Sequence, residues 1–182
     1  MKTLGLPRPL ILLLALASTA YAQTDEPVRD EPTPTDEKYH YNTVYDYSDA
    51  VPYRFNAAEL TRLAKSLLGT PYLSEGKEPS GFDCSGFTFY VFKQYGVYLP
   101  YFSSQQGEIG EAVSLTDTQP GDLIFFKGYD LYGAIGHVGI VVSQKGEKLS
   151  WIHASSSKGV CPDNMANRYY QSRFVGIRRV AQ

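Results

Sequence analysis

The stretch Gly-Phe-Asp-Cys-Ser-Gly-Phe at residues 81–87 constrains the fold of this chain more than any other. Cys84 stands where a loop rich in glycine and proline meets an apolar run at residues 87–92. Asp83 is a favoured N-cap, and Gly96 is a favoured residue just after a helix end. We therefore predict a buried helix that begins at Cys84 and ends at about Tyr95.

The first turn of a helix is an unusual electrostatic setting for a thiol. Unpaired backbone N–H groups and the positive end of the helix dipole favour an anion there. They bias a thiol toward the thiolate, which is the nucleophilic form. A free cysteine is also among the most deeply buried residue types. On this stretch alone, Cys84 is either a nucleophile or a small residue of the core.

The first 50 residues are predicted to lie outside the folded domain. Residues 1–22 combine two early basic residues, a short apolar run at residues 10–17 and an Ala-Tyr-Ala site, and are typical of a secretory signal peptide. That apolar run is far shorter than the ~20 residues of a membrane-spanning helix. Residues 23–50 are polar, acidic and proline-bearing, which predicts a flexible tether ahead of one domain at residues 51–182. We expect export across the inner membrane, to the periplasm or the cell exterior.

Composition narrows the class of partner. The formal net charge of −2 argues against nucleic acid or an anionic membrane as the main partner. Two cysteines are too few for a fold held together by disulfides. Neither cysteine lies near the cleavage site, so we expect no lipid-modified cysteine there and no membrane anchor after cleavage. A monomer is expected.

Helical patterns come first in the predicted domain, and strands come later. Asn56 and Glu59 form a capping-box pattern ahead of leucines and alanines at helical spacing, and Gly69 ends that run. Residues 103–107 fit one short helical turn. Strands are predicted at residues 123–126, 138–142, 148–154 and 174–180. This order predicts an α+β fold in which N-terminal helices pack on a central antiparallel sheet.

His137 and His153 flank one predicted hairpin. Gly146 suits the last position of a three-residue loop, which would pair Ser143 with Glu147. That register sets the two histidines directly opposite each other on one face, with Cβ atoms ~5 Å apart. A two-residue loop would send them to opposite faces. Two touching histidines suit a relay in which the first takes a thiol proton and the second fixes its orientation and tautomer. Taken singly, each histidine would instead be a structural or surface residue.

Four motifs, in this order and spacing, resemble those of the NlpC/P60 cysteine peptidases. They are Asp-Cys-Ser-Gly-Phe at 83–87, Pro-Gly-Asp-Leu-Ile-Phe-Phe at 120–126, Gly-His-Val-Gly-Ile-Val at 136–141 and Ile-His-Ala at 152–154. The resemblance implies a papain-like α+β fold for a catalytic domain at residues 51–182. It implies cleavage of peptidoglycan stem peptides, typically at the γ-D-glutamyl–diamino acid bond. It also implies Cys84 as nucleophile, His137 as base and His153 as the polar residue that orients the base.

The same resemblance assigns residues to the substrate cleft. Tyr72 matches a tyrosine that lies across the cleft from the cysteine and helps to bind the oxyanion. Asp83 and Ser85 match positions that contact the stem peptide. Relatives usually have two glycines soon after this tyrosine, whereas Glu75 stands in this chain, which alters the shape and charge expected of the cleft wall. The implied partner is peptidoglycan or a muropeptide, and no cofactor or metal is implied.

Three other interpretations use the same residues. A structural zinc site from Cys84, Cys161, His137 and His153 has suitable ligand types, but no two of these lie close in sequence as zinc ligands usually do. An N-acetylmuramoyl amidase, or another thiol acyl transfer on this fold, would keep the nucleophile and change the scissile bond. A non-catalytic wall-binding protein would keep the fold alone. Cys161 is predicted to be a free thiol without a role in the reaction, so that Cys161→Ser retains activity.

Overall fold

The computed structural model describes residues 56–181, and the predicted signal peptide and tether lie outside these residues. The described elements are, in chain order, α1 (Ala57–Ser66), β1 (Lys77–Glu78), β2 (Gly81–Phe82), α2 (Cys84–Lys93), α3 (Ser103–Gln106), β3 (Glu111–Val113), β4 (Leu123–Lys127), β5 (Ile135–Val141), β6 (Ser150–Ser155), β7 (Gly159–Asn164), α4 (Arg168–Gln171) and β8 (Phe174–Arg179). Helices precede the main strands, as predicted.

Side-chain caps define the starts of the two longer helices. The Asn56 side chain accepts hydrogen bonds from the backbone N–H groups of Ala58 and Glu59, and α1 begins directly after it. The Asp83 carboxylate accepts the N–H of Gly86, and α2 begins at Cys84. Both N-terminal boundaries were predicted from the sequence, because a capping side chain satisfies N–H groups that the helix itself leaves free.

The main sheet has six strands in the order β3-β8-β4-β5-β6-β7, and every neighbouring pair is antiparallel. The predicted α+β fold with an antiparallel sheet is therefore confirmed. Within the described residues, β1, β2, β3, β7 and α4 were not predicted. β7 contains Pro162, which lacks a backbone N–H and is tolerated because β7 is an edge strand.

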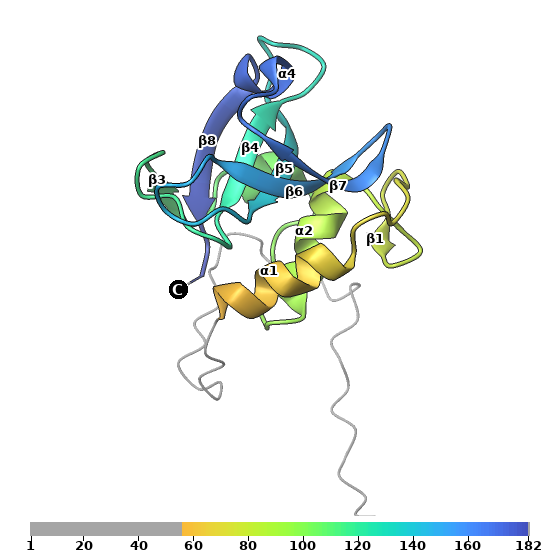
Figure 1. Ribbon diagram of the computed structural model, residues 1–182. Helices are drawn as coiled ribbons and strands as arrows, with labels where there is room; N and C mark the ends of the chain where they lie inside the picture. Colours follow the sequence, from red (N-terminus) through yellow and green to blue (C-terminus); the bar gives the residue numbers. More distant parts are fainter. Residues whose placement is uncertain (1–55, 182) are drawn as a thin grey trace, which may run out of the picture. The chain divides into compact units, whose positions relative to one another are not determined.

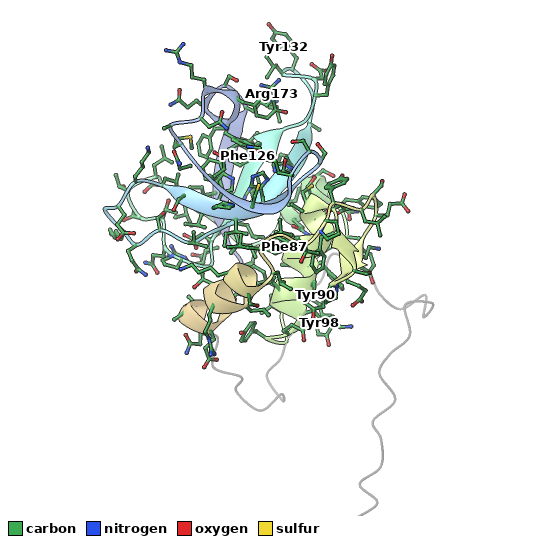
Figure 2. The ribbon with its side chains drawn as sticks, turned by 45° about the vertical axis from the view of Figure 1, so that its right-hand side comes forward. Phe87, Tyr90, Tyr98, Phe126, Tyr132 and Arg173 are labelled. Carbon is green, nitrogen blue, oxygen red and sulfur yellow. The ribbon has the colours of Figure 1, made fainter. Side chains whose placement is uncertain are left out.

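Each face of the sheet is covered by its own apolar cluster. Phe87 and Val91 of α2 pack with Phe125, Val138 and other buried residues between the helices and the sheet. The opposite face carries a second cluster of Ile124, Phe126, Val141, Trp151, Tyr170 and Ile177. Figure 1 shows α1 and α2 on one side of the strands and α4 at the other end of the domain, and Figure 2 shows Phe87 and Phe126 on opposite sides of β6. Alternate residues of a strand therefore face different clusters.

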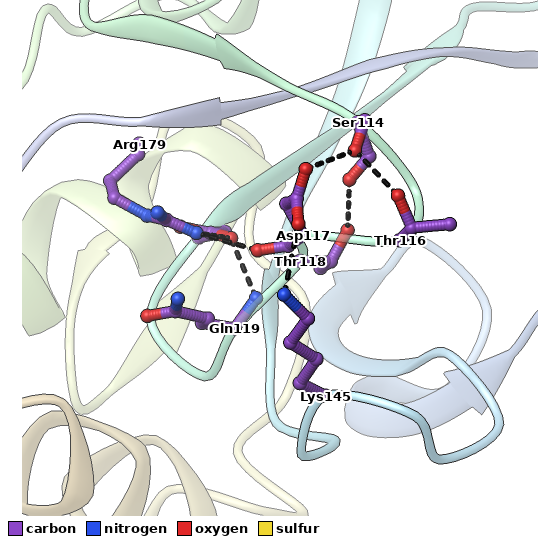
Figure 3. Close-up of polar contacts among 8 residues, drawn as sticks. Ser114, Thr116, Asp117, Thr118, Gln119, Lys145 and Arg179 are labelled. Carbon is purple, nitrogen blue, oxygen red and sulfur yellow. Dashed lines mark hydrogen bonds and ion pairs between the residues drawn. The ribbon is translucent and has the colours of Figure 1, made fainter.

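A buried ion pair ties the end of the chain to the start of β4. Arg179 donates to both carboxylate oxygens of Asp122 at 2.8 and 2.9 Å, and Asp122 is only 1% exposed. The same guanidinium donates to the carbonyl of Asp117, whose carboxylate pairs with Lys145 (Figure 3). The aspartate of the Pro-Gly-Asp motif is therefore a structural residue. No helix among residues 56–181 has both the length and the apolar character needed to cross a bilayer.

Candidate active site

Cys84 is the first residue of α2, where it was predicted, and its sulfur meets several backbone N–H groups. These belong to Val138 of β5, to Ser85 and to Cys84 itself, and each lowers the pKa of the thiol. The contact with Val138 places the sulfur beside the residue that directly follows His137. Two of the three residues predicted to form a relay are thereby brought to one place.

The pKa of the Cys84 thiol contradicts the expectation of a thiolate. Burial, followed by the negative charge of Asp83, raises this pKa to about 11, and the N–H groups offset only part of the rise. The helix start acts in the predicted direction, but the removal of water from a buried sulfur outweighs it. Burial therefore favours the protonated thiol over the thiolate in the folded protein.

A buried glutamine fixes the helix that carries Cys84. Gln106 is 0% exposed and donates from its amide nitrogen to the carbonyl oxygens of Ser85 and Pro100, at 3.2 and 2.8 Å. Its amide oxygen accepts the hydroxyl of Thr88 at 2.7 Å. Because all of these groups are buried, losing one partner would leave others unpaired. Beyond the predicted turn at residues 103–107, no sequence pattern indicated this contact.

The two histidines form a direct hydrogen bond. Nε2 of His137 lies 2.8 Å from Nδ1 of His153, and the ring planes are nearly perpendicular at 88°. His153 is fully buried, whereas His137 is partly exposed. The predicted contact between these side chains is confirmed.

The predicted strand register behind that contact is wrong by two residues. Ile140 pairs with Ile152 and Val141 with Trp151, so an extension of this register sets Gly139, and not His137, opposite His153. A Cβ on Gly139 would lie 3.2 Å from the Cβ of His153, which agrees with this position. A shift of two residues keeps every side chain on its face, because the side-chain period of a strand is two. The histidines are thus diagonal neighbours, still within reach of long side chains.

The difference in register comes from the connection between the strands. Glu147 N–H donates to the carbonyl of Gln144, which closes a tight turn, and Gly146 takes a φ of +87° within it. The hydroxyl of Ser143 then accepts the backbone N–H of Ser150, in place of a ladder bond between Ser143 and Glu147. The glycine signal located the turn but not the width of the connection.

Burial lowers the pKa values of both histidines. The pKa of His137 falls to about 3, first through burial and then through the neighbouring His153. The pKa of His153 falls to about 4, first through burial and then through the positive charge of Lys158. Both rings are therefore neutral at pH 7. Since Nε2 of His137 faces His153, Nδ1 is the ring nitrogen that this hydrogen bond does not engage.

Two further groups lie behind His153, and neither was predicted to take part in the reaction. The hydroxyl of Tyr170 is 3.4 Å from Nε2 of His153, and the sulfur of Cys161 is 3.7 Å from the same atom. Cys161 pairs directly with His153 across β6 and β7, and Tyr170 belongs to α4. Both come from elements that were not predicted.

The three predicted cleft residues also gather around Cys84. Tyr72 is 37% exposed, and burial followed by the charges of Cys84 and Asp83 raises the pKa of its hydroxyl. One Asp83 oxygen caps α2 and also accepts the hydroxyl of Ser85 at 3.1 Å. Glu75, in the place usual for glycine, adopts a φ of +60° and stays exposed. The backbone path of a glycine is thus kept at some conformational cost.

The loop at residues 72–78 packs directly on α2. A Cβ added to Gly86 would lie 2.0 Å from the carbonyl oxygen of Gly76. The helix and the loop approach so closely only because Gly86 lacks a side chain. Among residues 56–181, no group of three or more histidine, cysteine, aspartate or glutamate side chains converges as a metal site would require.

A thiol at a helix start beside a hydrogen-bonded histidine pair is the arrangement of enzymes that use a cysteine nucleophile. Residues 69–179 match the NlpC/P60 family model, and the chain belongs to this family. The probable endopeptidase NlpC of Escherichia coli (strain K12) is 36% identical over 124 residues, which cover 68% of this chain and 77% of that protein. The gamma-D-glutamyl-L-lysine dipeptidyl-peptidase of Bacillus subtilis (strain 168) is 35% identical over 136 residues, or 72% of this chain and 45% of that protein.

The solved structures agree with this assignment. A crystal structure of an NlpC/P60 family protein from Bacillus cereus matches with a TM-score of 0.64 and 32% identity, covering 70% of this chain and 41% of that one. The chain spans only about a quarter to a half of the length of several curated relatives that it matches. The predicted family and the predicted fold are both confirmed.

Proposed function

We propose that this protein is a cysteine endopeptidase that hydrolyses peptidoglycan stem peptides, at the bond between γ-D-glutamate and the diamino acid. The observation that carries the proposal is the hydrogen bond of 2.8 Å between His137 and His153, next to a helix start that presents the Cys84 thiol. The roles proposed are nucleophile for Cys84, base for His137 and orienting residue for His153. Relatives named as gamma-D-glutamyl-L-lysine dipeptidyl-peptidase and as endopeptidase support the substrate class and bond type.

The first half of the reaction forms a thioacyl enzyme. The Cys84 sulfur attacks the amide carbonyl carbon while its proton moves to Nδ1 of His137. The backbone N–H of Cys84 and the hydroxyl of Tyr72 donate to the oxygen that becomes negative, and one such donor is typically worth ~3–4 kcal/mol. Nδ1 of His153 accepts a hydrogen bond from the Nε2–H of His137, which keeps both of its protons and is stabilised as an imidazolium.

The second half of the reaction releases the product and restores the thiol. His137 gives its Nδ1 proton to the leaving amine, and the C–N bond breaks. The neutral imidazole then takes a proton from water, which attacks the thioester carbonyl. The sulfur leaves and recovers the proton, so the net reaction consumes one water and needs no cofactor. Such a reaction places the protein outside the cytoplasm, where peptidoglycan lies.

Digestion of purified peptidoglycan tests the proposal. The wild-type protein is expected to change the muropeptide profile, with new products that end at γ-D-glutamate when analysed by mass spectrometry. Cys84→Ala is expected to leave the profile unchanged, and Cys161→Ser, which removes the other thiol of the chain, is expected to retain activity. Products cut between N-acetylmuramic acid and L-alanine would instead establish an amidase. An unchanged profile with folded wild-type protein would favour a binding protein.

A further inference from the structure

The proposed reaction requires one particular placement of protons on the ring nitrogens of the two histidines. His137 must keep Nδ1 free to take the thiol proton, so its Nε2 must carry a proton and donate to Nδ1 of His153. His153 must then be the tautomer that carries its proton on Nε2. A buried N–H of this kind needs an acceptor, because a buried donor without a partner is costly.

Tyr170 is placed to supply that acceptor. Its hydroxyl lies 3.4 Å from Nε2 of His153, and Tyr170 is only 8% exposed. We propose that Tyr170 is a positioning residue, whose hydroxyl oxygen accepts the Nε2–H of His153 and so selects the tautomer that makes His137 a base. The inference rests on the proposed function, since it assigns a role within the same site.

The packing of Tyr170 fixes the position of its hydroxyl against both histidines. Its ring is nearly parallel to the ring of His137, with an interplanar angle of 25° and ring centroids 6.0 Å apart. It is nearly perpendicular to the ring of His153, with an interplanar angle of 77° and centroids 5.3 Å apart. The Tyr170 ring also packs against the rings of Phe126 and Trp151, with centroids 4.9 and 5.3 Å away. An aromatic ring held on several sides leaves the hydroxyl little freedom to turn away.

Two alternatives compete for the same nitrogen. The Tyr170 hydroxyl could donate to Nε2, which would place the His153 proton on Nδ1 and the His137 proton on Nδ1, so that His137 could not act as a base. The Cys161 sulfur, at 3.7 Å, is the second contact of this nitrogen, but sulfur is a weak acceptor. The proposal predicts that the phenolic oxygen, and not the sulfur, decides the tautomer.

Nitrogen-15 NMR of the imidazoles tests the proposal without substrate. Wild-type protein is expected to show His153 protonated at Nε2, with the signal assigned by its loss in His153→Gln. Tyr170→Phe keeps the ring and removes only the hydroxyl, and we expect a mixture of the two tautomers. Tyr169→Phe is the matched control, since Tyr169 is 52% exposed in the same helix, and we expect the wild-type spectrum.

Kinetics on defined muropeptides give the second readout. For Tyr170→Phe we expect a fall in kcat of about tenfold with little change in KM, because the lost hydrogen bond orients the base and contacts no substrate. A His153 protonated at Nδ1 in the wild-type protein, or an unchanged tautomer and kcat in Tyr170→Phe, would overturn the proposal. If neither wild type nor Cys84→Ala cleaves, the proposed function fails while the tautomer measurement still decides the role of Tyr170.

Discussion

The buried histidine at position 153 makes the stability of this fold sensitive to acid. His153 is fully buried, and burial together with Lys158 lowers its pKa to about 4. In the unfolded chain, a histidine has a pKa of about 6.5. As the pH falls below 6.5, His153 binds a proton in the unfolded chain but stays neutral in the folded protein. The contribution of this residue is therefore fully present above pH 6.5 and is lost as the pH falls toward 4.

The size of the loss follows from the two pKa values. A full pH unit between them is worth about 1.4 kcal/mol, and the unfolded histidine is already half protonated at pH 6.5, so acidification from pH 6.5 to pH 4.5 should lower the free energy of unfolding by about 2 kcal/mol through this residue. Urea titrations at a series of pH values would measure it, with fluorescence of the single, buried Trp151 as the signal. His153→Gln provides the control, because it cannot titrate and its amide can still bond His137.

The dependence of the unfolding free energy on pH in wild type and in His153→Gln tests this prediction. The free energy of unfolding should fall more steeply with acid in the wild-type protein than in His153→Gln, and the difference should accumulate between pH 6.5 and 4.5. Equal slopes in the two proteins would show that folded His153 binds a proton as easily as an unfolded histidine does. That result would refute the burial argument, and with it the claim that this ring is neutral in the site.

Three further predictions concern activity, the loop and the ion pair. Because burial lowers the pKa of His137 to about 3, the acid limb of the kcat/KM profile of still-folded protein should lie well below pH 6.5, and a limb at or above 6.5 would contradict this. Glu75→Gly should raise the free energy of unfolding by about 1 kcal/mol in urea titrations, since Glu75 sits at a φ of +60°, and a destabilised variant would refute the assigned strain. Arg179→Met should lower the free energy of unfolding by about 3 kcal/mol, because it leaves the buried Asp122 carboxylate without its cationic partner and with only the backbone N–H of Gln119 as a donor. Calorimetry would check the last change, and a neutral effect would mean that Asp122 finds another partner.

The helix caps and the shared face of the two histidines were predictable from local chemistry. Asp83 and Asn56 are capping residues whose short side chains satisfy the first N–H groups of a helix, and both helices begin where those caps predict. The face on which His137 and His153 meet was also predictable, since a strand alternates its side chains with a period of two. Both rules act over a few residues and do not depend on the rest of the fold.

The two groups behind His153, Cys161 and Tyr170, were not predictable, for equally physical reasons. Cys161 belongs to a strand that contains Pro162, and a proline within a short run normally argues against a strand. Tyr170 belongs to a helix of four residues, too short for any periodic pattern to appear. Both positions depend on long-range packing around His153, which local sequence does not encode.

The failure of the thiolate prediction explains how the site should work. The helix start does favour a negative sulfur, but burial disfavours a lone charge on either partner, and it moves the pKa of Cys84 up and that of His137 down. The two charges attract each other, and they do so more strongly in the same poorly solvated surroundings. Neither group therefore ionises alone, and the thiolate and the imidazolium arise together when the proton crosses. In the reaction proposed above, the thiol would then be protonated at rest and the nucleophile would arise only as the bond to the substrate forms, which would also limit oxidation of Cys84, since oxidants attack the thiolate.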